Sequence, residues 1–265
     1  MISQNGHKND LWNAYRYGDK IKIVYYKCGK EACKSARKRP KHKICEANDE
    51  EVAERLAASI SRTKATIFEL AMCNAFEYFV TLTLSAEKRD RFALKNFSRD
   101  FGQFVRNENK KRPEGQKIEY LLIPEQHQDG AWHAHGLIKG LTGNDLKRNT
   151  KGYLEWFAYS KRFGFFSCSA IKSHEACCKY ITKYITKDVK KSTDLQAGAH
   201  SYYASQGLQR RELLERYAYG DNLLFDPRGE WDFENEWVKI LWLKITPEGV
   251  VKDRPQAVGI LEEEI

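Results

Sequence analysis

The sequence predicts an α+β fold in which helices cover one face of an antiparallel sheet. Short segments rich in aromatic and β-branched residues, such as 77–85, are typical of buried strands. Apolar residues recur at helical spacing in longer segments, such as 90–111. The dipeptide Asp129-Gly130 lies between two strand-like segments and is a strong hairpin signal, which makes these neighbouring strands antiparallel. The order strand, helix, strand, strand, strand, helix fits such a layered fold.

The first regular element is a long helix. Acidic residues follow Asn48 at its start, and Ala53 and Ile60 share its apolar face, which continues to about Cys73. Ser173 can cap a later helix that contains the repeated sequence KYITKYITKD. The other predicted elements are a strand at 77–85, a helix at 90–111, and strands at 117–125, 131–140, 164–171, 200–208 and 236–245. No regular pattern is found at 141–163.

Composition and charge favour a polyanionic partner in the cytoplasm. Lysine and arginine outnumber the acidic residues by 45 to 36, which gives a net charge of +9. No apolar run approaches the roughly 18 residues of a membrane span, and the first ten residues lack the pattern of a signal peptide. We therefore expect no membrane partner and a cytoplasmic location, in a bacterial host. Seven cysteines without a secretion signal favour thiols or metal ligands over disulfides.

Residues 1–48 form a basic, cysteine-containing N-terminal segment. Between residues 27 and 43 there are eight lysine or arginine residues and one glutamate, without an apolar period. We expect this segment to contact the nucleic acid backbone. The predicted DNA-binding residues are Lys34, Arg37, Lys38 and Arg39.

The same segment offers a second interpretation, a structural Zn²⁺ site. Thiolate and imidazole ligands can close a tetrahedral zinc site, although their spacing here is loose. The four candidate ligands are Cys28, Cys33, His42 and Cys45.

A predicted strand pair carries a candidate metal site. His133 and His135 alternate along one strand, so their imidazoles share a face. A pair of partly buried histidines on an ordinary sheet would explain this pattern alone. If the hairpin turns near Asp129, however, Glu125 lies opposite His133 at about 5 Å and supplies a carboxylate. Two imidazoles and one carboxylate suit Mg²⁺ or Mn²⁺, with His127 as the competing third ligand.

The repeat places two tyrosines one helical turn apart. At about 100° per residue, Tyr180 and Tyr184 lie about 40° apart on one helix face, with Lys183 and Lys187 along its flank. An ordinary amphipathic helix would show the same pattern. Beside a metal site, however, a cation and an ammonium group favour the phenolate, which can attack a phosphodiester. A phosphotyrosyl bond conserves the energy needed to rejoin the strand, and two tyrosines allow two successive transfers.

Three segments together resemble the HUH endonucleases, specifically the two-tyrosine rolling-circle replication initiators (Rep proteins) of microvirus-type phages and plasmids. FVTLTLS resembles the first family motif, PEQHQDGAWHAHGLI the metal motif, and KYITKYITKD the tyrosine motif. The resemblance covers roughly residues 76–210. Ala134 departs from the bulkier apolar residue that is usual between the histidines.

The resemblance implies a ferredoxin-like or RRM-like sheet in a domain at 49–210, with a C-terminal extension at 211–265. It implies Mg²⁺ or Mn²⁺ as cofactor, a single-stranded DNA origin as substrate, and host DNA polymerase and helicase as partners. The implied metal ligands are Glu125, His133 and His135, the implied nucleophiles are Tyr180 and Tyr184, and the implied assisting groups are Lys183 and Lys187.

Three alternatives remain open from the sequence. An HUH transposase or relaxase would share the same chemistry. A non-catalytic RRM-like module would bind single-stranded nucleic acid through its aromatic and basic residues. A zinc-stabilised regulator would depend on the cysteines of residues 1–48.

Overall fold

The α+β class is confirmed by the structure. Every strand pairing among the described residues is antiparallel, and four helices accompany the strands. No helix among these residues has the length and apolarity needed to cross a membrane. The computed structural model describes residues 11–27, 49–185, 200–218 and 231–252.

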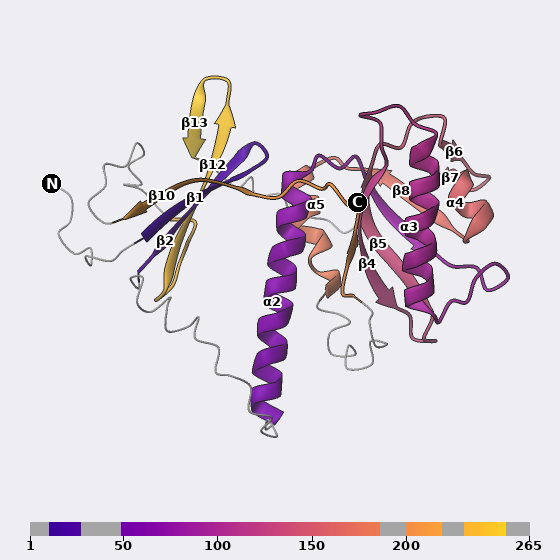
Figure 1. Cartoon of the computed structure of the whole chain (residues 1–265), viewed down its shortest axis with the longest axis horizontal. Helices are drawn as coiled ribbons and strands as arrows, with labels where there is room; N and C mark the ends of the chain where they lie inside the picture. Colours follow the sequence, from indigo (N-terminus) through magenta and orange to yellow (C-terminus); the bar gives the residue numbers. More distant parts are fainter. Residues whose placement is uncertain (1–10, 28–48, 186–199, 219–230, 253–265) are drawn as a thin grey trace. The chain divides into compact units, whose positions relative to one another are not determined.

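The chain divides into two compact units, and each contains one sheet (Figure 1). We call residues 53–209 with 258–265 the central unit, and residues 1–52 with 210–257 the terminal unit. The terminal unit therefore combines segments from both ends of the sequence.

The sheet of the central unit has seven strands in the order β6-β7-β8-β3-β5-β4-β9. The two long central strands β5 and β3 pair along their whole length, and β4 pairs with the other edge of β5. The strands are β3 (Tyr78–Thr83), β4 (Glu119–Gln126), β5 (Trp132–Lys139), β6 (Leu146–Arg148), β7 (Leu154–Trp156), β8 (Phe166–Ala170) and β9 (Tyr203–Ala204). The helices are α2 (Asp49–Cys73), α3 (Leu94–Lys110), α4 (Phe157–Arg162) and α5 (His174–Ile181).

One face of this sheet carries an aromatic core under α3 and α4. Val80 and Leu82 of β3 point into it, because alternate residues of a strand share a face. Phe101 of α3 contacts Tyr120 of β4 and Tyr159 of α4, with ring centroids 4.9 and 6.1 Å apart. Each such buried side chain contributes about 1.5–3 kcal/mol. The apolar period of α3 therefore fixes this helix on the sheet.

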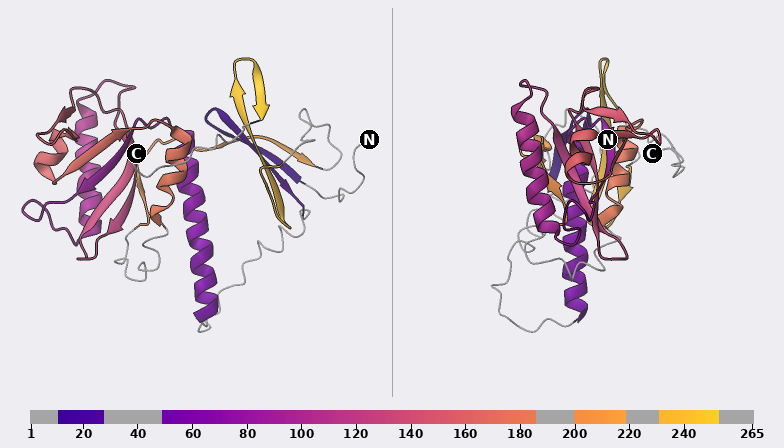
Figure 2. Two further views of the ribbon diagram at one scale, coloured as in Figure 1. Left: turned by 180° about the vertical axis from the view of Figure 1, so that it is seen from behind. Right: turned by 90° about the vertical axis from the view of Figure 1, so that its right-hand side faces the viewer.

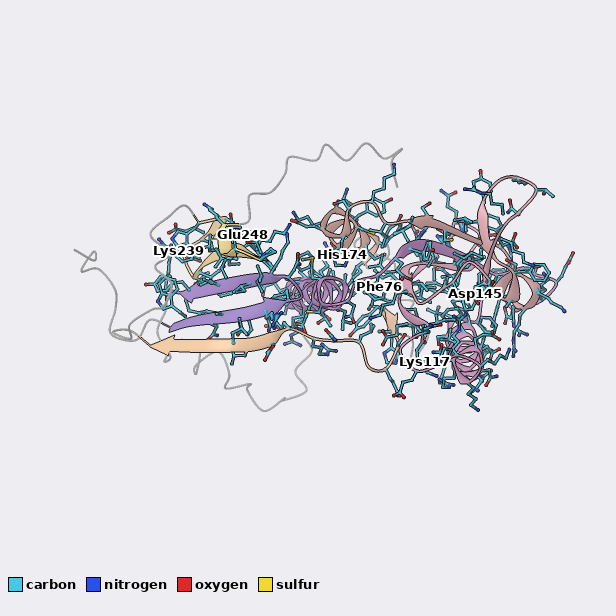
Figure 3. The ribbon with its side chains drawn as sticks, turned by 90° about the horizontal axis from the view of Figure 1, so that it is seen from above. Phe76, Lys117, Asp145, His174, Lys239 and Glu248 are labelled. Atoms are coloured by element: carbon cyan, nitrogen blue, oxygen red, sulfur yellow. The ribbon has the colours of Figure 1, made fainter. Side chains whose placement is uncertain are left out.

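The helices are divided between both faces of the sheet, which corrects the prediction that they cover one face. The rings of Tyr180 and Tyr184 contact Phe79, which alternates with the core residue Val80 on β3. In Figure 2, α3 and α5 lie on opposite sides of the strands. Seen from above in Figure 3, the labelled residues His174 and Lys117 mark these two sides. The α5 face is the one that carries the candidate site.

Element boundaries differ from the predicted ones where side chains bind the backbone locally. α3 begins at Leu94 instead of 90, because the Asp90 carboxylate accepts the N–H of Phe92 at 2.8 Å and holds a turn. The predicted strand at 200–208 is limited to β9, and a turn follows it at 206–207. The stretch 141–163, which shows no pattern in the sequence, contains β6, β7 and α4.

The sheet of the terminal unit has six strands. Its path is β10-β1-β2-β12-β11, and β13 pairs with β12. Ile23, Leu241 and Leu243 form a small core on one face of this sheet, with Trp12, Ile21 and Trp231 packed against them. The strands are β1 (Leu11–Tyr17), β2 (Lys20–Tyr26), β10 (Glu212–Ala218), β11 (Phe233–Glu234), β12 (Val238–Thr246) and β13 (Gly249–Lys252).

A tight hairpin starts the terminal sheet. Gly18 and Asp19 connect β1 to β2, and Gly18 has a φ of 60°, which glycine adopts without steric cost. Residues 1–48 and 211–265 are two separate extensions in our sequence analysis. In the structure, β1 and β2 of the first segment pair with β10 and β12 of the second.

Candidate active site

Two adjacent strands bring an acid and two imidazoles together. Glu125 of β4 lies directly opposite His133 of β5, as the hairpin signal predicts, and His135 follows two residues later on the same face. The Nε2 atoms of the two imidazoles are 3.0 Å apart. Each Nε2 is also 3.0 Å from Oε2 of Glu125. The three candidate ligand atoms therefore form a nearly equilateral triangle.

This triangle fits a divalent cation. An octahedral ion holds adjacent ligands at about 90° and about 2.1 Å, which separates the ligand atoms by about 3 Å. Among the described residues, the three form the group of histidine, cysteine and acidic side chains that could hold a metal ion. One carboxylate and two imidazoles suit several divalent metals, so the donor set does not select one.

The surroundings of both histidines prepare Nε2 as a ligand atom. Burial lowers the pKa of His133, and the nearby His127 lowers it further, against the opposing effect of Glu125. The neutral imidazole, which is the form that binds a metal, is therefore favoured at neutral pH. The Thr81 hydroxyl of β3 lies 3.2 Å from Nδ1 of His135. An Nδ1–H donated to Thr81 leaves the lone pair on Nε2.

His127 lies beside the triangle but outside it. Its ring is 3.9 Å from that of His133, at an interplanar angle of 36°. His127 belongs to the turn after β4, which begins where its N–H donates to the carbonyl of Ala131 at 2.8 Å. We assign it to packing on His133 instead of to the group of three candidate ligands.

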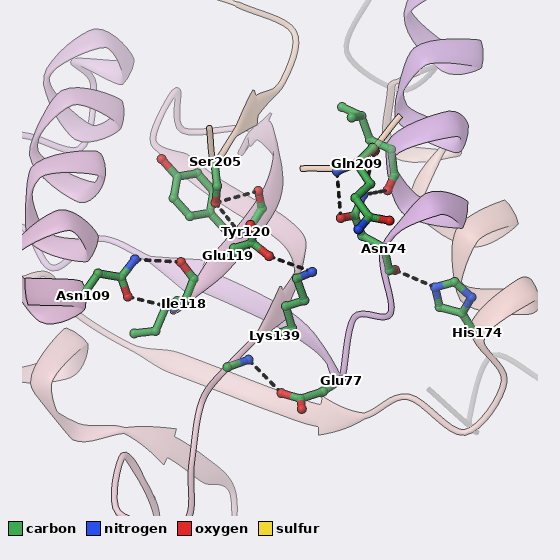
Figure 4. A network of polar contacts seen from close by, with 12 residues as sticks. Asn74, Glu77, Asn109, Ile118, Glu119, Tyr120, Lys139, His174, Ser205 and Gln209 are labelled. Atoms are coloured by element: carbon green, nitrogen blue, oxygen red, sulfur yellow. Dashed lines mark hydrogen bonds and ion pairs between the residues drawn. The ribbon is translucent and has the colours of Figure 1, made fainter. Parts of the chain in front are cut away.

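The helix α5 is held in place at its first turn. The Ser173 hydroxyl accepts the N–H of Ala176, so the predicted cap is confirmed. Nε2 of His174 lies 3.0 Å from the backbone carbonyl of Asn74, just after α2. Figure 4 shows this contact beside a second pair, in which Asn74 and Gln209 exchange two hydrogen bonds. These contacts tie α5 to the end of α2 and limit its movement over the sheet.

The tyrosine segment departs from a continuous helix at Thr182. Its hydroxyl donates to the carbonyl of Lys179 at 2.8 Å, and the N–H of Lys183 donates to the carbonyl of Tyr180 at 2.9 Å. The second bond spans three residues, as in a 3₁₀ turn. The helical conformation resumes at Tyr184. This tight turn still leaves the two phenols on the same side.

Both phenols lie at the candidate metal site. The Tyr184 ring stacks on His135 with a centroid distance of 4.1 Å and an interplanar angle of 22°. Its hydroxyl is 2.9 Å from that of Tyr180. Phe79 contacts both tyrosine rings, at 5.7 and 6.2 Å. The structure thus brings together Glu125, both histidines and both tyrosines.

The two phenols have different environments. Tyr184 is buried, with 8% of its surface exposed, whereas Tyr180 is partly exposed. Burial raises the pKa of Tyr184 far above its ordinary value, and the Tyr180 hydroxyl and the Glu125 carboxylate raise it further. Tyr184 is therefore a phenol at neutral pH in this environment, able to donate a hydrogen bond to Tyr180 or accept one from it.

One of the two predicted lysines can be placed. The ammonium group of Lys183 lies 5.4 Å from the centroid of the Tyr180 ring, within the range of a cation–π contact. The remaining predicted residues lie outside the described part of the chain: Lys187, the DNA-binding residues Lys34, Arg37, Lys38 and Arg39, and the zinc candidates Cys28, Cys33, His42 and Cys45.

A cavity of about 490 Å³ borders the site on the side of His127. Nε of Arg91 is buried without a hydrogen-bond partner among the described residues, and Nη2 lies 3.6 Å from Oδ2 of Asp129. The cavity is lined in part by Thr83, Arg91, His127, Gln128, Asp129 and Trp132. It can hold a group of nucleotide size beside a cationic side chain.

Sequence reasoning missed several of these contacts. It assigns Thr81 to strand packing, whereas the pairing of β3 with β5 sets Thr81 directly opposite His135. Phe79 and Arg91 received no role. Knowledge that β3 neighbours β5 would have identified Thr81 and Phe79, because both share the parity of the histidine face.

Comparison with known proteins supports a replication protein. No curated protein and no solved structure matches the chain at a significant level. Residues 77–189 match the family model of the replication-associated protein ORF2. This segment covers somewhat less than half of the chain and contains the histidines, the tyrosines and Glu125. The match supports a replication-associated protein of the rolling-circle Rep type.

Proposed function

We propose that this chain initiates rolling-circle replication by nicking and rejoining single-stranded DNA through a phosphotyrosine intermediate. One observation carries the proposal. The Tyr184 ring stacks on His135, a candidate metal ligand, and the Tyr180 hydroxyl lies 2.9 Å from that of Tyr184. Two potential nucleophiles therefore lie beside one potential cation site. The match to a replication-associated family over the same residues supports this assignment.

The reaction exchanges one phosphoester bond for another. The phenolic oxygen bonds to the phosphorus while the bond from phosphorus to the 3′ oxygen breaks. The phenol loses its proton, and the released 3′ oxygen gains one. The 5′ phosphate stays on the tyrosine, and the 3′ hydroxyl is left to serve a host DNA polymerase. Rejoining is the same step in reverse, with a 3′ hydroxyl as the attacking group.

The side chains of the site have separate tasks. A divalent cation held by Glu125, His133 and His135 would polarise a phosphoryl oxygen and favour the phenolate. Tyr180 is the more exposed phenol and is proposed to attack first. Tyr184 can donate its hydrogen bond to the oxygen of Tyr180, which stabilises the developing negative charge. Lys183, above the Tyr180 ring, adds positive charge near the phosphate.

The partners follow from this assignment. The substrate is a single-stranded origin, and the cavity beside Arg91 offers space for a nucleotide next to the cleaved phosphate. A host helicase would separate the strands, as in the family that the chain resembles.

Covalent trapping tests the proposal. The full chain is incubated with Mn²⁺ or Mg²⁺ and a library of single-stranded oligonucleotides labelled at the 3′ end. Because the 5′ phosphate joins the tyrosine, the label should migrate with the protein on a denaturing gel. Mass spectrometry of the labelled peptide then identifies the attacking oxygen.

Tyrosine variants make the test specific. The double variant Y180F/Y184F should lose the labelled band, and each single variant should retain some nicking while losing efficient rejoining. Y153F is a matched control, because Tyr153 is 55% exposed and is not part of the site. Undiminished labelling of the double variant would exclude tyrosine attack. Salt-sensitive binding without any adduct in the parent chain would instead support a non-catalytic binding module.

A further inference from the structure

The terminal sheet has a second face that differs from its small apolar core. The register across β1, β2 and β12 aligns two rows on this face. Because directly opposed residues of antiparallel strands share a face, each row forms a continuous line of side chains. We call these two rows the basic aromatic face: Tyr15, Lys22 and Trp242 in one row, and Tyr17, Lys20 and Lys244 in the other.

Rings and cations are packed together on this face. The Lys22 ammonium group lies 5.5 Å from the centroid of the Trp242 ring, and the Tyr17 ring lies 5.2 Å from the same ring. Arg211 joins them from the segment before β10. Its guanidinium lies 4.3 Å from the Tyr15 centroid and donates to the Tyr17 hydroxyl at 3.1 Å. The rings thus hold four cationic side chains at one surface.

The charge of this face is unbalanced. Each of the two rows contains cations and rings and no acidic residue. Burial lowers the pKa of Lys22, and the positive charge of Arg211 lowers it further. Two cations are therefore close enough to repel each other. A bound anion between them would relieve this repulsion.

The opposite face provides an internal contrast. There, Lys27 and Lys239 both form ion pairs with Glu234, at 2.6 and 3.0 Å. Lys239 also lies 5.8 Å from the Trp231 ring. The same sheet thus neutralises cations with an acid on its apolar face and surrounds them with aromatic rings on the other.

We propose that the basic aromatic face binds a segment of single-stranded DNA outside the tyrosine site. Cations bind the phosphates, and aromatic rings offer stacking surfaces to bases, as in single-strand binding proteins. A single strand is favoured over a duplex because its bases are free to leave their own stack. The choice of DNA rests on the proposed function, whereas the location of the surface does not. This face would add affinity for the origin region without taking part in cleavage.

Anisotropy of a fluorescein-labelled, 30-nucleotide single-stranded DNA measures the contribution of this face. The double variant K22Q/R211Q of the full chain should bind at least about tenfold more weakly at 100 mM salt. Loss of two phosphate contacts should also reduce the slope of log K against log salt by about 1.4. The conservative variant K22R/R211K should restore most of the affinity, because it keeps both charges.

The matched control changes the same net charge on the same sheet. K27Q/K239Q removes two cations from the opposite face and should change the affinity less than about threefold. An equal loss in both double variants would reduce the effect to overall charge and overturn the proposal. Unchanged binding by K22Q/R211Q would overturn it too, as would stronger competition by duplex DNA or RNA than by single-stranded DNA. Circular dichroism of each variant establishes that it folds, and Y15L provides a second test if K22Q/R211Q does not.

This result is separate from that of the tyrosine site. Adduct formation is measured on the parent chain alone. If the parent forms no adduct while K22Q/R211Q still loses affinity, the proposed nicking function fails and the binding face stands. If the parent forms the adduct and K22Q/R211Q binds normally, the outcome is reversed.

Discussion

The two sheets of this protein have opposite chemistry on their polar faces. In the central unit, the face opposite the α3 core presents Glu125, two imidazoles and two phenols. In the terminal unit, the face opposite the apolar core presents lysines, an arginine and aromatic rings. Both sheets are antiparallel, so strand geometry does not cause the difference. It is the identity of the residues aligned in register across neighbouring strands that gives one face groups for chemistry and the other groups for binding.

Removal of the carboxylate should have the largest effect, and only on the central unit. E125Q keeps the shape of the side chain but loses its charge, so affinity for Mn²⁺ should fall more than about 100-fold, beyond the effect of losing an outer partner. Isothermal titration with Mn²⁺ measures this loss. Binding of single-stranded DNA by the terminal unit should stay within about twofold. Unchanged Mn²⁺ affinity would remove Glu125 from the ligand set.

Truncation of a core residue should affect the terminal unit in turn. Leu241 is buried with Ile23 and Leu243, so L241A should lower the free energy of unfolding of this sheet by about 2–5 kcal/mol. Thermal unfolding should then show an early transition separate from that of the central unit, because two units need not unfold together. Mn²⁺ affinity should not change. A single transition shifted as a whole would mean that the two sheets unfold as one.

Loss of the Thr81 hydroxyl should have a moderate effect within the central unit. T81V keeps the size of the side chain but removes the partner of Nδ1 of His135. Mn²⁺ affinity should fall by about 10–100-fold, and T81S should recover most of it. If T81S binds as weakly as T81V, Thr81 acts through packing instead of through its hydroxyl.

The smallest expected effect is on stability and depends on pH. Burial opposes ionisation of Asp145, but hydrogen bonds from Arg112 and Thr142 outweigh it and hold the pKa of the carboxyl below its ordinary value. Stability from this lowered pKa is present above the unfolded value of about 3.8 and is lost as the pH falls through the folded value. D145N should therefore destabilise the central unit by about 1.5 kcal/mol at pH 7. Denaturant unfolding at pH 7 and pH 3 should show this difference shrinking in acid.

Local signals in the sequence predicted the parts of the site that lie close together in the chain. Asp129-Gly130 and the alternation around it predicted the β4–β5 hairpin, and hence the pairing of Glu125 with His133. Ser173 predicted the start of α5. Each signal acts over a few residues, so no alignment of distant strands is needed to interpret it.

Contacts between distant segments could not be predicted in this way. Thr81 faces His135 only because β3 joins β5, and nothing local specifies that pairing. The sequence has Gly18-Asp19 between apolar alternating segments, a hairpin signal that could have identified β1 and β2. Their pairing with β10 and β12, however, joins opposite ends of the chain. The proposed roles of the site residues remain predictions for the experiments above.

The pairing of β2 with β12 has a consequence for biogenesis. The N–H of Ile245 donates to the carbonyl of Asp19 at 2.8 Å, so the first hairpin receives its neighbour only near the end of translation. The whole central unit leaves the ribosome in between and can fold first, since domains generally fold as units during synthesis. Such a distant strand pairing forms slowly. A nascent chain would thus acquire its tyrosine centre before its terminal sheet closes.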